Sequence, residues 1–105
     1  MVGQIPEEDY PKYAEVLVDF FNDERTLFVI SSDFCHWGQR FRFTHKYENF
    51  EEVEIYKSIE QLDKQGMQLI EMQTLAGFQQ YLKETGNTIC GRNPIQLLLA
   101  IIEEA

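Results

Sequence analysis

The chain has 105 residues, of which 9 are basic and 18 acidic, so its formal net charge at pH 7 is −9. This charge argues against nucleic-acid binding, because a phosphate backbone requires basic patches, and no apolar run approaches the ~18 residues of a membrane span. Two cysteines are too few for a disulfide framework, and the N-terminal residues lack the basic start and apolar stretch of a signal peptide, so we expect a cytoplasmic protein with free thiols.

The first predicted element is an amphipathic helix over about residues 8–23. Apolar side chains recur there at three- and four-residue steps, and Pro11 falls in the first turn, where a helix tolerates proline. Next comes the apolar run LFVI at residues 27–30, which predicts a strand buried on both faces, as in a parallel sheet covered by helices. Residues 40–44 alternate aromatic and basic side chains, so a short strand and an extended loop both remain open there.

Three helices are predicted in the second half of the chain. The apolar phase of residues 54–72 continues through Gly66, which predicts one long helix even though a glycine weakens it by about 1 kcal/mol relative to alanine. Thr74 is the expected N-cap of the next helix, and Gly86 is its expected C-terminal stop. Pro94 then occupies the expected first position of the last helix.

The order helix, strand, helix, helix, helix predicts an α/β fold that is rich in helices and has few strands. Residues 95–102 are apolar around more than half of the last helix, as in a helix covered on most sides. The predicted strand needs neighbouring strands, and at most one other convincing strand is present. We therefore expect residues 1–105 to form a single partial domain, which is either an interior piece of a larger protein or a chain that pairs with another.

The first candidate site is the sequence SSDFCHWG at residues 31–38, directly after the predicted strand. Ligands of open α/β sheets bind where loops leave the carboxyl ends of the strands. Asp33 and His36 stand three residues apart there, so they could share a metal ion or work as an acid–base pair. The alternative is that Asp33 caps a turn while His36 and Trp37 pack and form hydrogen bonds, and the spacing alone favours this alternative.

The second candidate site is the sequence NTICGRNP at residues 87–94. Cys90 lies a few residues before a helix N-terminus, where N–H groups favour a thiolate, and a thiolate is a soft ligand for iron, copper or zinc. Gly91 would let a ligand or another backbone approach closely. The alternative is a buried, inert cysteine in a tight loop, which is favoured when this motif is taken alone.

Charged residues between the two candidate sites have simpler interpretations. Arg40 and Arg42, beside Phe41, could bind a phosphate or a carboxylate, or they could form a solvated face whose stems lie on aromatic side chains. A group of acidic residues without cation-site spacing predicts a surface loop, and its members are Glu48, Glu51, Glu52 and Glu54.

Two motifs taken together resemble one known family. The sequences LFVISSDFCHWGQRFRF at residues 27–43 and NTICGRNPI at residues 87–95, with EIYKSIEQLDKQG at residues 54–66 between them, closely resemble the MEMO family, named for a mediator of receptor-tyrosine-kinase-driven cell motility. The resemblance covers essentially the whole chain but only the later-middle part of the family's length. It implies that the chain is a fragment of an αβα fold similar to that of class III extradiol, non-haem iron dioxygenases.

The resemblance also implies roles for residues of both motifs. Family members hold iron or copper with two histidines and one cysteine, and Cys90 matches that cysteine. The two histidines have no counterpart here, so we expect this chain alone not to hold the metal tightly. Asp33 and His36 match an acidic residue and a histidine of the same cleft, where they would be catalytic. The family is also associated with binding a phosphotyrosine-containing receptor tail there, through positions that match His36 and Cys90, and Trp37 and Arg40 would add an aromatic face and a cation.

Three functions remain open at this stage. The first is a protein of receptor tyrosine kinase signalling and cell motility that binds a phosphotyrosine-containing receptor tail or an adaptor protein through His36, Trp37, Arg40 and Cys90. The second is an iron- or copper-dependent redox or dioxygenase-like enzyme with an incomplete metal site. The third is a truncated variant without a function of its own, for which the apolar surface of the last helix is the motive.

Overall fold

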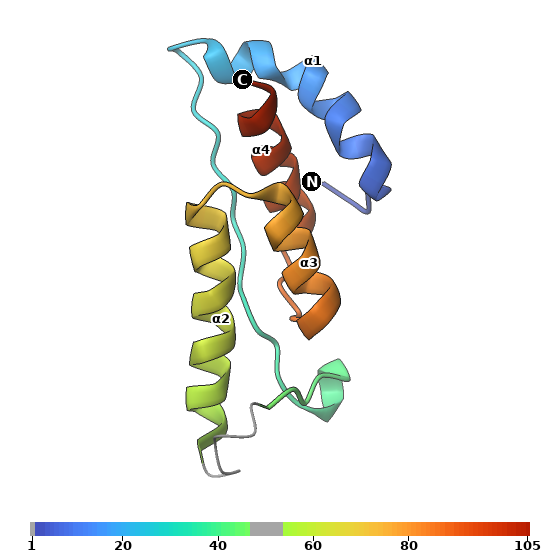
Figure 1. Cartoon of the computed structure of the whole chain (residues 1–105), viewed down its shortest axis with the longest axis vertical. Helices are drawn as coiled ribbons and strands as arrows, with labels where there is room; N and C mark the ends of the chain where they lie inside the picture. The colour runs from blue at the N-terminus through green and yellow to red at the C-terminus, as the bar shows by residue number, and fades with distance from the viewer. Residues whose placement is uncertain (1, 47–53) are drawn as a thin grey trace.

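The structure is a computed structural model that describes residues 2–46 and 54–105. It is elongated, with principal-axis extents of 48 × 22 × 21 Å, and α1 lies across one end of α4 while α2 and α3 stand side by side (Figure 1). In chain order the elements are η1 (Glu7–Asp9), α1 (Tyr10–Asn22), η2 (Gln39–Phe41), α2 (Ile55–Glu71), α3 (Leu75–Thr85) and α4 (Arg92–Glu104). None of these helices combines the length and the apolar character that crossing a membrane requires.

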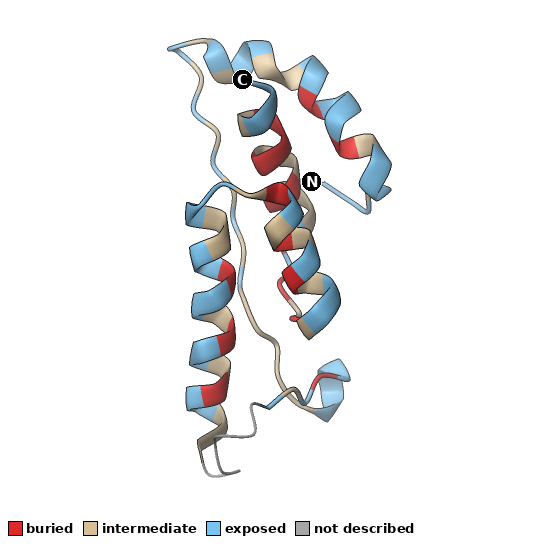
Figure 2. Cartoon of the chain, viewed as in Figure 1, coloured by how far each residue is buried: buried red, intermediate tan, exposed pale blue. Residues whose placement is uncertain are grey.

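The predicted first helix is confirmed, and one stripe of it is buried against α4. Tyr10 and Ala14 are buried, while Leu17 and Phe21 are half-buried and pack on the same core, which is the three- and four-residue spacing of one helix face. Pro11 lies in the first turn, as expected, where its missing N–H has no helical partner to lose. The buried positions line the inner sides of the helices (Figure 2).

The two helices predicted after residue 54 are confirmed as α2 and α3, which form a helical hairpin. The Thr74 side chain accepts a hydrogen bond from the Gly77 N–H at 3.1 Å, and Gly86 ends α3 with a left-handed backbone at φ 67°. The long helix continues through Gly66, where an added Cβ would lie 3.0 Å from the Tyr81 hydroxyl. Gly66 thus lets α3 approach α2 closely, and the Tyr81 hydroxyl donates to the Leu62 carbonyl at 2.7 Å.

The last helix begins earlier than the sequence predicted. Its first residue is Arg92, so Pro94 stands at the third helical position rather than the first. Proline is tolerated there for the same reason, because the first-turn N–H groups of a helix have no partner within it. The predicted burial of much of its surface is confirmed, since Ile95, Leu99 and Ile101 are among its buried side chains.

The predicted strand at residues 27–30 does not form. Within the described residues there is no strand, and the β-type pairing recorded there is an isolated antiparallel bridge between Gly38 and Phe43. Leu27 and Val29 are 85% and 79% exposed, whereas Phe28 and Ile30 are half-buried. The burial predicted for both faces was wrong for this structure, because helices cover one face and no second strand of the described chain pairs with the segment. The prediction of a helix-rich chain with few strands is confirmed.

The segment after the first candidate site folds as a tight turn. Of the strand and the extended loop left open for residues 40–44, the structure contains neither, because η2 occupies the start of this stretch and Arg42 is left-handed at φ 55°. The bridge between Gly38 and Phe43 closes the turn. Of the predicted acidic loop, Glu54 forms an exposed ion pair with Lys57 at 3.1 Å, and Glu48, Glu51 and Glu52 lie outside the described residues.

Candidate functional site

The two candidate motifs lie side by side, although more than fifty residues separate them in sequence. The Cys90 N–H donates to the Asp33 carbonyl at 3.3 Å, and the Gly91 N–H donates to Ser32 Oγ at 2.9 Å. Gly91 is buried against Ser32 so closely that a Cβ would overlap the serine side chain. We call the contact of residues 32–36 with residues 88–91 the loop junction.

Cys90 is an exposed thiol at one end of the loop junction. Its Sγ accepts a hydrogen bond from the Asp33 N–H at 3.2 Å and lies 3.8 Å from Ser32 Oγ. The burial of this cysteine that was considered from the sequence is therefore wrong. Because α4 begins at Arg92, the sulfur stands close to the N-terminal end of a helix dipole.

His36 is fixed at the other end of the loop junction by a single residue. Its N–H donates to Thr88 Oγ1 at 2.6 Å, Thr88 Oγ1 donates to its carbonyl at 2.9 Å, and its Nδ1 lies 2.9 Å from the Thr88 carbonyl. A carbonyl oxygen can only accept, so this last contact requires the proton on Nδ1. Nε2 is then the ring nitrogen left for a ligand.

Trp37 and Arg40 lie in the turn that follows His36. The Trp37 indole N–H donates to the His45 carbonyl at 2.8 Å, which anchors the half-buried ring. The Arg40 guanidinium lies 5.7 Å from the centre of the Phe41 ring, and that ring lies 5.2 Å from the His36 ring. Arg40, Phe41 and His36 therefore form a continuous row of a cation and two rings.

The structure places Asp33 and His36 in different contacts. Within the described chain, the backbone of Asp33 bonds to Cys90, and His36 bonds to Thr88. The sequence predicted that Asp33 and His36 act together, whereas in the structure each of them contacts a residue of the second motif. Their catalytic roles stay predictions.

Three residues support the loop junction that were given no role from the sequence, namely Asp63 of α2, and Asn87 and Thr88 of the second motif. Asp63 Oδ1 accepts from the Asn87 amide at 2.8 Å and Asp63 Oδ2 from the Cys35 N–H at 3.4 Å, so helix α2 ties the two loops together. Burial raises the pKa of the Cys35 thiol, and the Asp63 charge raises it further, which keeps this thiol protonated. No local signal identified these contacts, because each of them joins residues at least 24 positions apart.

The described residues do not fit an iron or copper site on their own. Within residues 2–46 and 54–105, no group of three or more histidine, cysteine and carboxylate side chains stands close enough together to hold a metal ion. A non-haem iron site generally takes three protein ligands on one face of the metal. Cys90 would supply one ligand at most.

We expect the purified chain, after exposure to Fe(II) or Cu(II) and dialysis, to retain well below one equivalent of metal. Plasma mass spectrometry measures the bound metal, and the Cys90→Ser variant is the control, which should retain as little as the unmodified chain. One equivalent of metal that disappears in Cys90→Ser would contradict this prediction.

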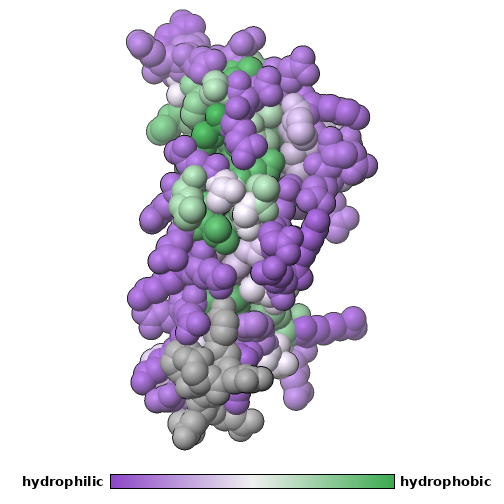
Figure 3. Space-filling model, in the orientation of Figure 1, coloured by the Kyte–Doolittle hydropathy of each residue, from purple (hydrophilic) through white to green (hydrophobic). Residues whose placement is uncertain are grey.

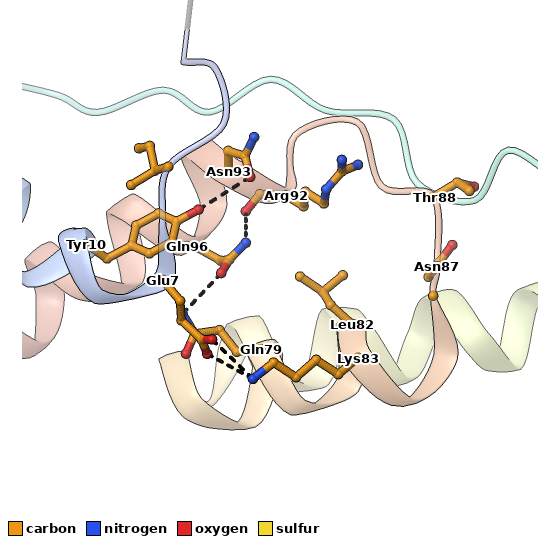
Figure 4. A pocket seen from close by; sticks show the side chains of 12 residues that line it. Glu7, Tyr10, Gln79, Leu82, Lys83, Asn87, Thr88, Arg92, Asn93 and Gln96 are labelled. Carbon is orange, nitrogen blue, oxygen red and sulfur yellow. Dashed lines mark hydrogen bonds and ion pairs between the residues drawn. The ribbon is translucent and has the colours of Figure 1, made fainter.

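A hollow of about 430 Å³ lies next to the loop junction, between the start of α1, helix α3 and the first turn of α4 (Figure 4). Its side chains contact one another: Lys83 pairs with Glu7 at 3.1 Å, and the Gln79 amide donates to Gln96 at 3.2 Å. The Gln96 amide donates in turn to the Arg92 carbonyl at 3.0 Å. Asp33, His36, Trp37, Arg40 and Cys90 do not line this hollow, but Thr88, which orients His36, does.

The amino-acid sequence of the chain matches one protein family and several curated proteins. A family model described as Memo-like protein matches residues 1–105. The chain is 48% identical over 103 residues to the Protein memo-1 homolog of Caenorhabditis elegans, which covers 98% of this chain and 29% of that protein. It is 50% identical over 99 residues to Protein MEMO1 of Xenopus laevis, and this match covers 94% of this chain and 33% of that protein. It is 47% identical over 104 residues to Protein MEMO1 of Homo sapiens, and that match covers 99% of this chain and 34% of the human protein. The chain therefore spans about a third of the length of the curated relatives it matches.

Proposed function

Because the chain belongs to the Memo-like protein family, we propose that it binds a phosphotyrosine-containing segment of a receptor tail or adaptor protein, within the receptor tyrosine kinase signalling that directs cell motility. The binding surface consists of the loop junction and the turn that follows it. The observation that carries the proposal is the row of Arg40, Phe41 and His36, which sets a cation beside two rings.

The turn gathers positive charge on one short segment of an acidic chain. Residues 34–46 contain no acidic residue, although the whole chain has 18. Within the described residues, no carboxylate forms an ion pair with Arg40, Arg42 or Lys46, whereas five other basic residues are paired, namely Lys12, Arg25, Lys57, Lys64 and Lys83. These three cations are therefore available to a dianionic phosphate.

The rings match the other half of a phosphotyrosine. Phe41 is 44% exposed, so its ring offers an aromatic surface beside the Arg40 guanidinium. Aromatic rings pair in tilted or offset arrangements with centroids about 4.5–7 Å apart, and a cation over a ring adds to that attraction. A tyrosine ring lying against Phe41 would bring its phosphate toward Arg40.

The loop junction adds polar groups next to this surface. His36 is oriented by Thr88 and keeps Nε2 for a ligand, and Cys90 presents an exposed sulfur beside the Asp33 backbone. The hydrogen bonds of the loop junction orient His36 and Cys90 but leave His36 Nε2 and the exposed Cys90 sulfur able to contact a ligand. We therefore assign the phosphate to Arg40 and its basic neighbours, and the flanking peptide to His36, Trp37 and Cys90.

Peptide titration tests the proposal. We expect a synthetic phosphotyrosine peptide, followed by fluorescence anisotropy, to bind at least about tenfold more tightly than its unphosphorylated twin, because a charge-assisted bond to arginine is worth more than a neutral one. Arg40→Ala should remove most of that difference.

Lys12→Ala is the matched control, because it also removes one positive charge but from the exposed surface of α1. It should leave the preference for phosphate intact. Equal binding of the two peptides would refute the proposal, and equal losses in Arg40→Ala and Lys12→Ala would reduce the effect to net charge.

A further inference from the structure

Thr88 holds both the backbone and the ring of His36. Its hydroxyl accepts from the His36 N–H at 2.6 Å and donates to the His36 carbonyl at 2.9 Å. Its own carbonyl lies 2.9 Å from Nδ1 of the ring and keeps the proton on that nitrogen. Thr88 therefore sets the place of His36 through its side chain and the tautomer of the ring through its backbone.

The other ring nitrogen of His36, Nε2, carries a lone pair. In a neutral imidazole one nitrogen donates and the other accepts, so a proton held on Nδ1 leaves Nε2 as an acceptor. Within the described residues Nε2 makes no hydrogen bond, and the side chain is half-buried. The ring beside it is that of Phe41, at 5.2 Å between centroids, and a phenyl ring has no N–H or O–H to offer.

A phosphate does not suit this nitrogen. The oxygens of a phosphate dianion are acceptors, and an acceptor facing the lone pair of Nε2 would be repelled. The Arg40 guanidinium, 5.7 Å from the centre of the Phe41 ring, offers donors instead. Hydrophilic side chains extend from the turn around η2, next to a small hydrophobic area (Figure 3). The row from Arg40 through Phe41 to His36 thus has a donor end and an acceptor end.

We propose that Thr88 is a positioning residue that presents Nε2 of His36 as a hydrogen-bond acceptor, so that the bound peptide must bring a donor to it. The inference rests on the proposed phosphotyrosine binding for its ligand. An extended peptide advances about 3.3–3.6 Å per residue, so a donor within about three positions of the phosphotyrosine reaches from Phe41 to His36. A side-chain hydroxyl and a backbone N–H supply the same chemistry there.

Nitrogen-15 NMR at pH 8 tests the role of Thr88 without any peptide. The chain has two histidines, so a His45→Gln background leaves only the signals of His36. We expect a protonated Nδ1 and an unprotonated Nε2. Thr88→Ser should keep this pattern because it keeps the hydroxyl, whereas Thr88→Val keeps the branched shape and should give a mixture of both tautomers.

Thr26→Val is the matched control, because it removes a threonine hydroxyl just after α1 and away from the loop junction. It should leave the His36 signals unchanged. A proton on Nε2 in the unmodified chain would overturn the proposal, as would an unchanged pattern in Thr88→Val.

Two scans of the phosphotyrosine peptide locate the donor. One compares threonine with valine at each position within about three residues of the phosphotyrosine, and the other replaces single backbone N–H groups by N-methyl. We expect one of these changes to weaken binding about three- to tenfold, as for one neutral hydrogen bond. The same change should cost nothing in His36→Phe, which keeps a ring but has no acceptor.

The outcomes separate this inference from the proposed function. A peptide that binds in preference to its unphosphorylated twin, but shows no position-specific loss in either scan, would overturn the donor requirement and leave the proposed function standing. Equal losses in the unmodified chain and in His36→Phe would do the same. Equal binding of the two peptides would refute the proposed function and the donor requirement with it, and the NMR pattern of Thr88→Val would then decide the role of Thr88 alone.

Discussion

The Gly91→Ala variant is expected to lose the loop junction while keeping its helices. The φ of Gly91 is −87°, which alanine adopts readily, so the effect comes from contact rather than from backbone strain. The added methyl group would overlap the Ser32 side chain and lie 3.1 Å from the Ser31 carbonyl. Overpacking of this kind lowers the free energy of unfolding by about 1–3 kcal/mol. Phosphotyrosine peptide binding should weaken at least about tenfold, because the loops that hold His36 and Cys90 must separate.

Two variants separate this contact from a general effect of alanine. Gly3→Ala is the control, because a Cβ at Gly3 would meet nothing within 4 Å, and it should change neither stability nor binding. The double variant Ser32→Gly with Gly91→Ala removes the overlapping serine side chain and should recover part of the binding. Normal peptide binding by Gly91→Ala would show that the loop junction does not position the site.

The Phe78→Ala variant is expected to lose most of the stability of the chain. Phe78 is fully buried in α3, and its ring lies 6.0 Å from that of Tyr81 within the core between α3, α4 and α2. Truncating a buried phenylalanine removes the transfer free energy of the ring and leaves a cavity, which together cost about 3–5 kcal/mol. Since small domains are stable by only about 5–15 kcal/mol, urea denaturation followed by circular dichroism should show a much lower midpoint or an unfolded chain.

Phe20→Ala is the matched control for the core truncation. Phe20 is 56% exposed on α1, so the same change of side chain removes little buried surface. Its free energy of unfolding should stay within about 0.5 kcal/mol of that of the unmodified chain. Similar losses in both variants would contradict the assignment of the core to the inner faces of α3 and α4.

The helices could be predicted because their signals are local. The Thr74 side chain caps an N–H three residues away, and Gly86 ends α3 through its own left-handed backbone. Residues this close in sequence meet in nearly any fold, so the pattern and the structure agree there. The local pattern could not decide which of two neighbouring aromatic residues would be covered. Phe21 packs on the core, where its ring lies 6.0 Å from the Phe28 ring, and Phe20 is left 56% exposed.

The candidate site was predictable in its members but not in its pairings. The two motifs pointed to Asp33, His36 and Cys90, and folding does bring the motifs together at the loop junction. The pairing of His36 with Thr88 spans 52 residues, and neither residue carries a local sign of the other. Long-range hydrogen bonds depend on where the helices set the two loops, so only the folded chain defines them.

The sequence by itself determined the approximate positions of the helices, the two caps of α3 and the residue types gathered at the candidate site, because these follow from backbone preferences and short-range periodicity. The tertiary structure decided that residues 27–30 have one covered face and one bare face. It also decided that Cys90 is exposed and bonded by Asp33. An apolar run favours burial, but the elements that pack against it determine how much of it is buried.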